Sequence, residues 1–357
     1  MINRRSWTPW SFVVLLSIFA WTGCGSESAP QEASWVRFDT GHGGTSLAID
    51  FQGGVWVASA GDGSLIRHLA DGTLEKEIPV EGNPRDLAID GSGRIWFVDA
   101  TQNGLSNGAL RRLDDGTSVV ESVILNKTPR KVALEPDGGV WVASETTLQR
   151  FTEEGEIDSN FDLPAPPLDL AVDHSGALWL LTASGKDGSG APLLMRLSPT
   201  GAVLVENSLT EYARRFALAP DGFVVVQDAK GRIYQYNELG SETGAYVPDP
   251  PFAQPGSAVG IAVSEGGEIV YATDTDLRVL SPELVELARY PFVDSETNTA
   301  YLLLPRDIAI GSRGQVWLLS ADPVSPASDS PENTTLLFID EVVSGGQYFP
   351  DPTMVWP

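Results

Sequence analysis

The sequence predicts an all-β fold, a seven-bladed β-propeller of four-stranded antiparallel blades, placed behind an export signal. A gapless fifteen-residue pattern recurs seven times, and successive copies start 38 to 47 residues apart. Each copy alternates between apolar and small or polar residues, as strands do, and lacks helical spacing. A repeat in the forties that is built from strands is typical of propellers.

Residues 1–23 read as a signal peptide. Arg4 and Arg5 form a basic start, an apolar run from Trp10 to Trp21 follows, and Thr22-Gly23 supply small residues before Cys24. The apolar run is shorter than the ~20 residues that a membrane-spanning helix needs. The segment resembles the signal of bacterial lipoproteins, which implies cleavage before Cys24 and lipidation of its thiol. Ordinary cleavage, leaving a free thiol, is the alternative.

The rest of the chain divides into a tether and one domain. Residues 24–33 contain small and polar residues and are expected to be a flexible tether, and residues 34–357 are expected to form the propeller. Cys24 is the chain's single cysteine, so no intrachain disulfide can form.

Three positions of the repeat predict its structure. The third is alanine in every copy and suits an innermost strand, where blades crowd the axis. The eighth is glycine in every copy, as expected for a turn between two strands. The eleventh is tryptophan in five copies: Trp56, Trp96, Trp141, Trp179 and Trp317. These rings could form a carbohydrate platform, but packing between neighbouring blades is the favoured interpretation. Arginines of the third strands are expected on a solvated outer face: Arg67, Arg112, Arg150 and Arg196.

Closure of the ring is also predicted. The segment from Trp35 to Phe38 precedes the first repeat and is phased as an outermost strand. It can pair with the strand that begins at Thr334 and so remove an open sheet edge. The tail from Glu341 to Pro357 is the competing candidate.

Strand order places the glycine turns on one face and the variable loops on the other. The long loops are residues 101–109, 184–192, 247–258, 293–304 and 322–333. Loops of variable length on a rigid scaffold are where binding sites usually develop. Any ligand is therefore expected on the long-loop face.

Each inner strand begins on that face with a pair of residues: Thr45-Ser46, Arg85-Asp86, Arg130-Lys131, Leu168-Asp169, Arg214-Arg215, Val259-Gly260 and Arg306-Asp307. The candidate ligand-binding residues are Arg85, Arg130, Arg214, Arg306, Asp86, Asp169 and Asp307. Four arginines at one phase could form an anion-binding mouth. The alternative, which we favour here, is a self-satisfied ring in which these arginines pair with Asp86, Asp169, Asp307, Asp99 or Asp228.

The units NPRDLAIDGSGRIWFVDA and LPRDIAIGSRGQVWLLSA resemble NHL repeats and the related virginiamycin B lyases and gluconolactonase-like propellers. The resemblance covers residues 34–340 and implies a six- or seven-bladed propeller. The lyases use histidines, a glutamate and a divalent metal, but this chain has only His42, His68 and His174 and no His-x-Glu pair. The lactonases use a first-blade glutamate, whereas Gly44 to Leu47 occupy that stretch here. No catalytic residue, metal ligand or cofactor is carried over, and none is expected.

Composition limits the partners. A formal net charge of −25 argues against a broad nucleic-acid-binding face. The leading hypothesis is a non-catalytic lipoprotein, monomeric and lipid-anchored at the cell envelope, which binds a protein, peptide or glycan. The alternative is a metal-assisted lyase or lactone hydrolase with an atypical site. A charge-paired axis would favour the first hypothesis, and a divalent metal at the axis the second.

Overall fold

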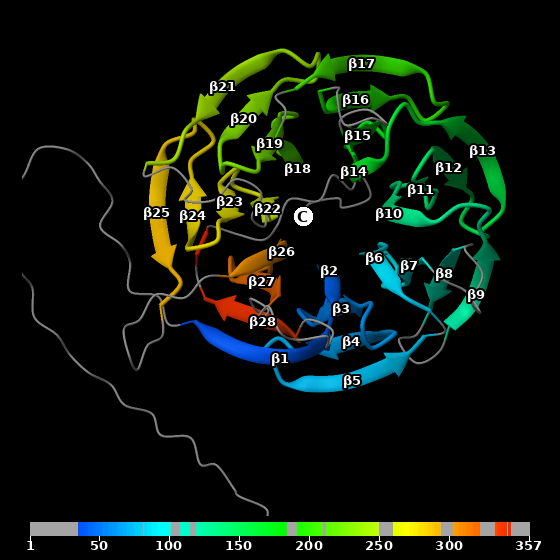
Figure 1. Cartoon of the computed structure of the whole chain (residues 1–357), viewed down its shortest axis with the longest axis horizontal. Coiled ribbons are helices and arrows are strands. Elements are labelled where there is room, and N and C mark those ends of the chain that lie inside the picture. Colours follow the sequence, from blue (N-terminus) through cyan, green and yellow to red (C-terminus); the bar gives the residue numbers. More distant parts are fainter. Residues whose placement is uncertain are drawn as a thin grey trace, which may run out of the picture.

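The computed structural model describes residues 35–80, 82–100, 108–114, 119–183, 191–209, 212–249, 260–293, 303–321, 333–340 and 342–343. Seven four-stranded antiparallel sheets stand around a central axis in chain order (Figure 1). The predicted fold class is confirmed. The predicted signal peptide, tether and Cys24 lie outside the described residues. Across the described ranges there is no helix that is long and apolar enough to cross a membrane.

The strands are as follows, from the axis outward in each blade. Blade 1 has β2 (Gly44–Ile49), β3 (Val55–Ser59), β4 (Ser64–His68) and β5 (Leu74–Pro79). Blade 2 has β6 (Pro84–Ile89), β7 (Ile95–Asp99), β8 (Ala109–Leu113) and β9 (Val119–Ile124). Blade 3 has β10 (Pro129–Leu134), β11 (Val140–Ser144), β12 (Thr147–Phe151) and β13 (Ile157–Asp162). Blade 4 has β14 (Pro167–Val172), β15 (Leu178–Thr182), β16 (Leu193–Leu197) and β17 (Val203–Ser208). Blade 5 has β18 (Ala213–Leu218), β19 (Val224–Asp228), β20 (Ile233–Tyr236) and β21 (Glu242–Tyr246). Blade 6 has β22 (Gly260–Val263), β23 (Ile269–Ala272), β24 (Asp276–Leu280) and β25 (Glu286–Pro291). Blade 7 has β26 (Leu304–Ile310), β27 (Val316–Ala321), β28 (Asn333–Ile339) and β1 (Val36–His42).

Burial follows the position of a strand in its blade. The second strand of every blade is buried at each residue, because neighbouring blades cover both of its faces. Outer strands such as β13 and β17 alternate between exposed and half-buried residues. This contrast explains why the second strands read as nearly continuous apolar runs while the outer strands are polar.

The tryptophans of the second strands pack between blades, which confirms the favoured interpretation. Trp96 of blade 2 belongs to one buried cluster with Val132 and Val140 of blade 3, and Trp179 of blade 4 to another with Phe216 of blade 5. All five rings are buried. They are therefore core residues and not a carbohydrate platform.

The predicted glycine turn is confirmed as well. The glycine at the eighth position has a φ between +78° and +93° in all seven blades. Residues with a Cβ resist this left-handed conformation, which accounts for the invariance of glycine at this position within the chain.

Strand β1 closes the ring, as predicted. It pairs antiparallel with β28, with Val36 opposite Phe338 and Phe38 opposite Leu336. Trp35 precedes the strand, packs edge-on against Phe292 at 5.1 Å, and donates a hydrogen bond from Nε1 to the Pro291 carbonyl. The first and last described strands of the chain thus share one blade, next to each other in Figure 1.

Candidate functional site at the mouth of the axis

A β-bulge marks the beginning of the inner strand in six blades. The register shifts at the first residue of the predicted pair, namely at Thr45, Arg85, Arg130, Leu168, Arg214 and Arg306. A bulge inserts one residue opposite the partner strand and re-aims the side chains beside it. The two members of each pair therefore have different surroundings.

The second residues of four consecutive blades form a chain of opposite charges around the axis. Lys131 Nζ lies 3.4 Å from Asp86 Oδ1 and 3.7 Å from Asp169 Oδ1. Arg215 Nη1 lies 3.5 Å from Asp169 Oδ1, and its Nη2 donates to the Arg306 carbonyl at 2.9 Å. Arg215 thus reaches blade 7 past blade 6, whose residue at this position is Gly260.

The three aspartates also join three pairs of neighbouring blades through backbone hydrogen bonds. Asp86 Oδ2 accepts the Val132 backbone N–H at 3.0 Å, and Asp169 Oδ2 accepts that of Phe216 at 3.1 Å. Asp307 Oδ2 accepts the Leu47 N–H at 3.0 Å and so joins blade 7 to blade 1. Each of the three carboxylates therefore accepts a backbone N–H and lies near a cationic side chain.

Burial and charge act against each other in this cluster. Burial raises the pKa of Asp307, although Arg215 and Lys131 oppose the shift. Burial would by itself lower the pKa of Arg215, but Asp169, Asp307 and Asp86 outweigh it and raise the pKa. Arg215 therefore keeps its charge as the central counter-ion of the aspartates.

Three of the four arginines at the first position, Arg85, Arg130 and Arg214, form no ion pair with the aspartates of this chain of charges. Arg85 and Arg214 are exposed and form no ion pair with any described residue, whereas Arg130 forms a surface pair with Glu145 at 3.0 Å. Arg306 is half-buried.

We predicted that the first-position arginines pair with the nearby aspartates, and this is wrong for Arg85, Arg130 and Arg214. Asp86 and Asp169 pair with Lys131 and Arg215, which occupy the second position. Asp99 pairs with Arg111 at 3.0 Å, and Asp228 pairs with Arg232 at 2.6 Å. The bulge is the physical reason, because it separates the directions of the first and second side chains.

On the opposite face, four blades share a unit that the sequence analysis missed. The acidic residue at the fifth position of the repeat accepts the indole N–H of the tryptophan six residues later: Asp50, Asp90, Glu135 and Asp173. Arginines complete the unit, and Arg67, Arg150 and Arg196 come from the third strand. These three side chains are mostly buried, so their predicted place on a solvated outer face is wrong. The constant spacing of acid and tryptophan was the available signal.

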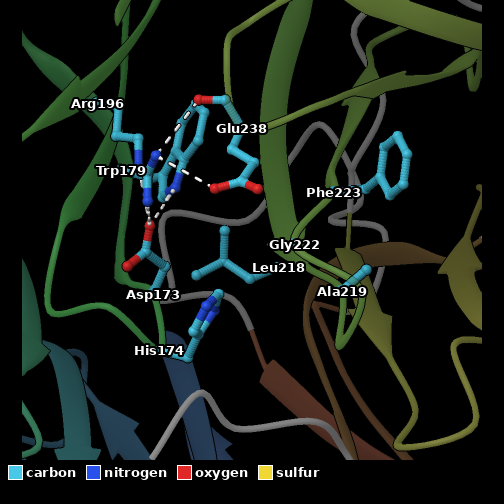
Figure 2. A pocket seen from close by; sticks show the side chains of 9 residues that line it. All are labelled: Asp173, His174, Trp179, Arg196, Leu218, Ala219, Gly222, Phe223 and Glu238. Atoms are coloured by element: carbon cyan, nitrogen blue, oxygen red, sulfur yellow. Dashed lines mark hydrogen bonds and ion pairs between the residues drawn. The ribbon is translucent and has the colours of Figure 1, made fainter. Parts of the chain in front are cut away.

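Figure 2 shows one such unit beside a small hollow between blades 4 and 5. Arg196 donates from Nε to Asp173 Oδ2 at 2.9 Å, and its guanidinium lies 5.6 Å from the Trp179 ring centre. Leu218 and Ala219 of blade 5 line the other side. The polar groups here satisfy one another, which indicates a structural clamp.

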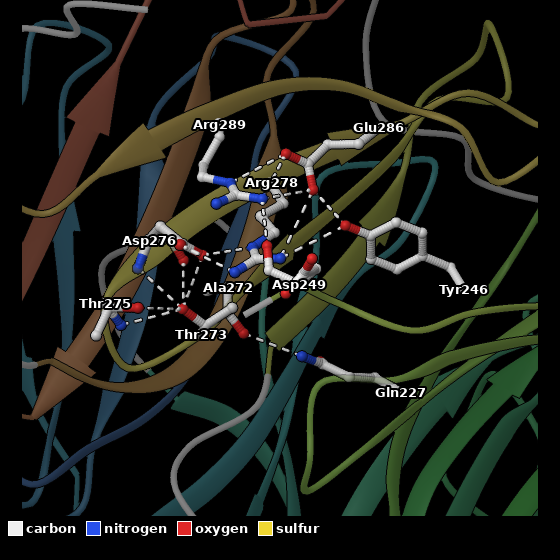
Figure 3. Close-up of polar contacts among 10 residues, drawn as sticks. All are labelled: Gln227, Tyr246, Asp249, Ala272, Thr273, Thr275, Asp276, Arg278, Glu286 and Arg289. Carbon is white, nitrogen blue, oxygen red and sulfur yellow. Dashed lines mark hydrogen bonds and ion pairs between the residues drawn. The ribbon is translucent and has the colours of Figure 1, made fainter. Parts of the chain in front are cut away.

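A second polar cluster joins blades 5 and 6 (Figure 3). Buried Arg278 bonds through Nε to Asp276 Oδ1 at 2.8 Å and lies 3.6 Å from Glu286. Glu286 also accepts a hydrogen bond from Tyr246 of blade 5 and pairs with Arg289 at 2.9 Å. Both carboxylates are thus occupied by cations of this chain, so this cluster too is structural.

The described residues hold no group of three or more His, Cys, Asp or Glu side chains that could bind a metal ion. His68 is buried between the Gly72 carbonyl and Thr40, and burial lowers its pKa. His174 lies exposed in a glycine turn, on the face opposite the mouth. Neither histidine can serve a site at the axis.

Comparison with known proteins shows similarity in fold alone. No protein-family model matches the chain, and no curated protein matches it. A solved streptogramin B lyase superposes with a TM-score of 0.65 at 17% identity, over 86% of this chain and 98% of that one. Virginiamycin B lyase from Staphylococcus aureus gives 0.64 at 15% identity, over 87% and 100%. Its catalytically inactive form with quinupristin also gives 0.64 at 15%, over 85% and 99%. The chain therefore has the seven-bladed propeller architecture of the virginiamycin B lyases.

Proposed function

We propose that this chain is a cell-envelope lipoprotein whose propeller binds an anionic ligand at the mouth of its axis. One observation carries the proposal. The charged groups at the axis are paired with one another, while Arg85 and Arg214 at the rim of the mouth are exposed and form no ion pair with described residues. The mouth thus offers guanidinium groups for a partner and leaves few free acids or bases at the axis for chemistry.

Local charge supports an anionic ligand. The pairs that begin the inner strands contain six cationic side chains, Arg85, Arg130, Lys131, Arg214, Arg215 and Arg306, against three aspartates, Asp86, Asp169 and Asp307. The chain as a whole has a net charge of −25, so this excess of positive charge is local. A guanidinium binds a carboxylate through two parallel hydrogen bonds. An acidic peptide or a glycan of sugar acids fits this arrangement.

The test is to replace arginines with glutamine and titrate oligogalacturonate and oligoglutamate by calorimetry. We expect Arg85→Gln and Arg214→Gln each to weaken binding about tenfold, since a bond to a charged group contributes ~1.5–3 kcal/mol. Their melting temperatures should stay unchanged, because neither residue pairs within the described chain. Arg313→Gln, which removes an exposed arginine on the opposite face, is the matched control.

Lys131→Gln and Arg215→Gln provide the contrast. Lys131→Gln removes the charge partner of buried Asp86, and Arg215→Gln removes one of the two charge partners of Asp169, so both should lower the melting temperature. Unchanged affinity in the Arg85 and Arg214 variants, or no binding by the wild-type chain, would reject the anion-binding mouth.

The fold similarity favours a second candidate, a lyase of the virginiamycin B type. It predicts that the purified protein opens the quinupristin ring in the presence of a divalent cation, which chromatography would detect. Intact quinupristin after prolonged incubation would reject this candidate.

A further inference from the structure

Blade 5 carries a lysine that lies over an aromatic ring on the long-loop face. Lys230, in the connection between β19 and β20, places its Nζ 4.1 Å from the centre of the Tyr212 ring. Tyr212 directly precedes β18, and the Ala229 backbone N–H donates to its carbonyl at 2.8 Å. This bond joins the connection that carries Lys230 to the beginning of the inner strand. The contact therefore lies close in the chain to Arg214, an arginine of the mouth that follows Tyr212 by two residues.

The positive charge of Lys230 is not neutralised within the described part of the chain. Its half-buried side chain forms no ion pair with a described residue. Asp228, two residues earlier, pairs through Oδ2 with Arg232 at 2.6 Å and accepts the Lys230 backbone N–H through Oδ1 at 2.8 Å. An aromatic ring attracts a cation through its quadrupole but carries no net charge. Tyr212 therefore holds the ammonium in place and leaves its charge for a partner.

Two unneutralised cations thus occur at the same end of blade 5. Arg214 is exposed and has no ion pair with a described residue. The other two cations at this end are occupied, since Arg215 pairs with Asp169 and Arg232 with Asp228. Arg214 and Lys230 therefore remain available to an anion from solution.

The scaffold itself does not require the contact between Tyr212 and Lys230. In three other blades a non-aromatic residue at the position of Tyr212 accepts the same backbone bond, at 2.7–3.1 Å: Gly43, Asn83 and Pro166. The position of Lys230 is occupied by Gly61 in blade 1 and by Thr275 in blade 6. The connection therefore closes without a ring or an amine, and the two side chains of blade 5 are additional to what the fold needs.

We propose that Lys230 and Arg214 form one anion subsite on blade 5, which binds the carboxylates of a sugar-acid chain, with Tyr212 as the positioning residue of Lys230. The inference rests on the proposed function of the mouth and deepens it. Arg214 supplies a planar fork for a carboxylate, and Lys230 supplies a compact charge beside it. Blade 5 is thus the part of the mouth where the ligand is held most strongly.

The fixed position of the ammonium favours a stiff ligand. A sugar acid carries its carboxylate directly on the pyranose ring, so binding orders few bonds. A glutamate side chain loses rotamer freedom when its carboxylate is bound, which costs up to about tenfold in affinity for each ordered side chain. We therefore expect oligogalacturonate to bind more tightly than an oligoglutamate of equal charge.

The experiment titrates both oligomers into the full chain and its variants by calorimetry. We expect Lys230→Gln to weaken oligogalacturonate binding about tenfold, as loss of a bond to a charged group does, with an unchanged melting temperature. Tyr212→Leu should weaken it roughly threefold, the size of an exposed cation–π contact. Tyr212→Phe keeps the ring and should keep the wild-type affinity, which separates the role of the ring from that of the hydroxyl group.

A double-mutant cycle tests whether the two cations act on one ligand group. The Arg214→Gln/Lys230→Gln variant should differ by about threefold or more from the product of the two single losses, because neighbouring contacts are coupled. Arg85→Gln/Lys230→Gln, which combines blades 2 and 5, should equal the product within about twofold.

Lys76→Gln is the matched control and should keep the wild-type affinity. Lys76 also lies over a ring, 5.2 Å from the centre of Trp56, but it belongs to β5, the outermost strand of blade 1.

The outcomes separate this inference from the proposed function. Weaker binding by Arg85→Gln and Arg214→Gln with an unchanged Lys230→Gln would leave the anion-binding mouth and reject the subsite. Losses at Arg214 and Lys230 with an unchanged Arg85→Gln would support the subsite and reject a mouth in which the arginines of several blades act together. Equal affinity for oligoglutamate would overturn the assignment to a sugar acid, and no binding by the wild-type chain would reject both proposals.

Discussion

At the scale of single residues, the seven repeats allow the acid–tryptophan unit to be compared within one chain. Where the fifth position is Ala219 or Ser264, the place of the tryptophan is taken by Val225 or Val270. Blade 7 combines Gly311 with Trp317, and there the buried indole N–H has no hydrogen-bond partner among the described residues. The acid at the fifth position therefore serves the indole and the arginine, as a buried polar group requires an acceptor.

We expect Asp173→Ala to destabilise the protein by about 3 kcal/mol, because it leaves the buried indole of Trp179 and the guanidinium of Arg196 without their shared acceptor. Denaturant unfolding measures this cost. Asp221→Ala is the control, since that exposed aspartate accepts, from the described part of the chain, only the backbone N–H of Phe223. Equal losses in the two variants would contradict a clamp at Asp173.

At the scale of elements, strand β1 depends on one turn of blade 1. The turn between β4 and β5 contains Gly72, at φ +82°, and a Cβ there would lie 2.0 Å from the Phe38 ring of β1. Gly93 has the same φ, and a Cβ there would meet nothing within 4 Å. A comparison of alanine variants at the two glycines therefore distinguishes the cost of backbone strain from the cost of a clash with the closing strand.

Gly93→Ala should cost about 1–2 kcal/mol, the penalty for a left-handed alanine. Gly72→Ala should cost roughly 1–3 kcal/mol more, because Phe38 must also move. Thermal unfolding of both variants tests the difference. Equal costs would mean that β1 adapts freely and that Phe38 contributes little to closure.

The sequence was sufficient for these elements because the repeat fixes the phase of every strand. The invariant glycine and alanine positions predicted the turns and the inner strands. The position of residues 35–38 relative to the first repeat predicted the strand that closes the ring. The pairing at the axis was not predicted correctly. It depends on the β-bulge before Asp86, Lys131, Asp169 and Arg215, and no particular residue type marks that bulge in the sequence. The alternating signs of these four residues in successive blades were the signal that could have shown it.

At the scale of the whole molecule, the proposed anchor and the ring are joined at one point, since the residues before Trp35 lead directly into the closing strand. We expect Cys24→Ala to shift the protein from the membrane fraction to the soluble fraction and to abolish labelling by fatty acid. The melting temperature should not change, because Cys24 precedes the ring. Unaltered fractionation and mass would show that Cys24 is not lipidated.

The pairing of β1 with β28 also sets the order of assembly. Val36 leaves the ribosome long before Phe338, its partner across the sheet. Contacts between such distant parts of a chain are costly in entropy and form late. Until β28 is synthesised, β1 has no strand to pair with, so the nascent chain exposes an unpaired strand for most of its synthesis. The strand pairing that closes the ring therefore forms last, and until then the unfinished chain exposes the surface that chaperones bind.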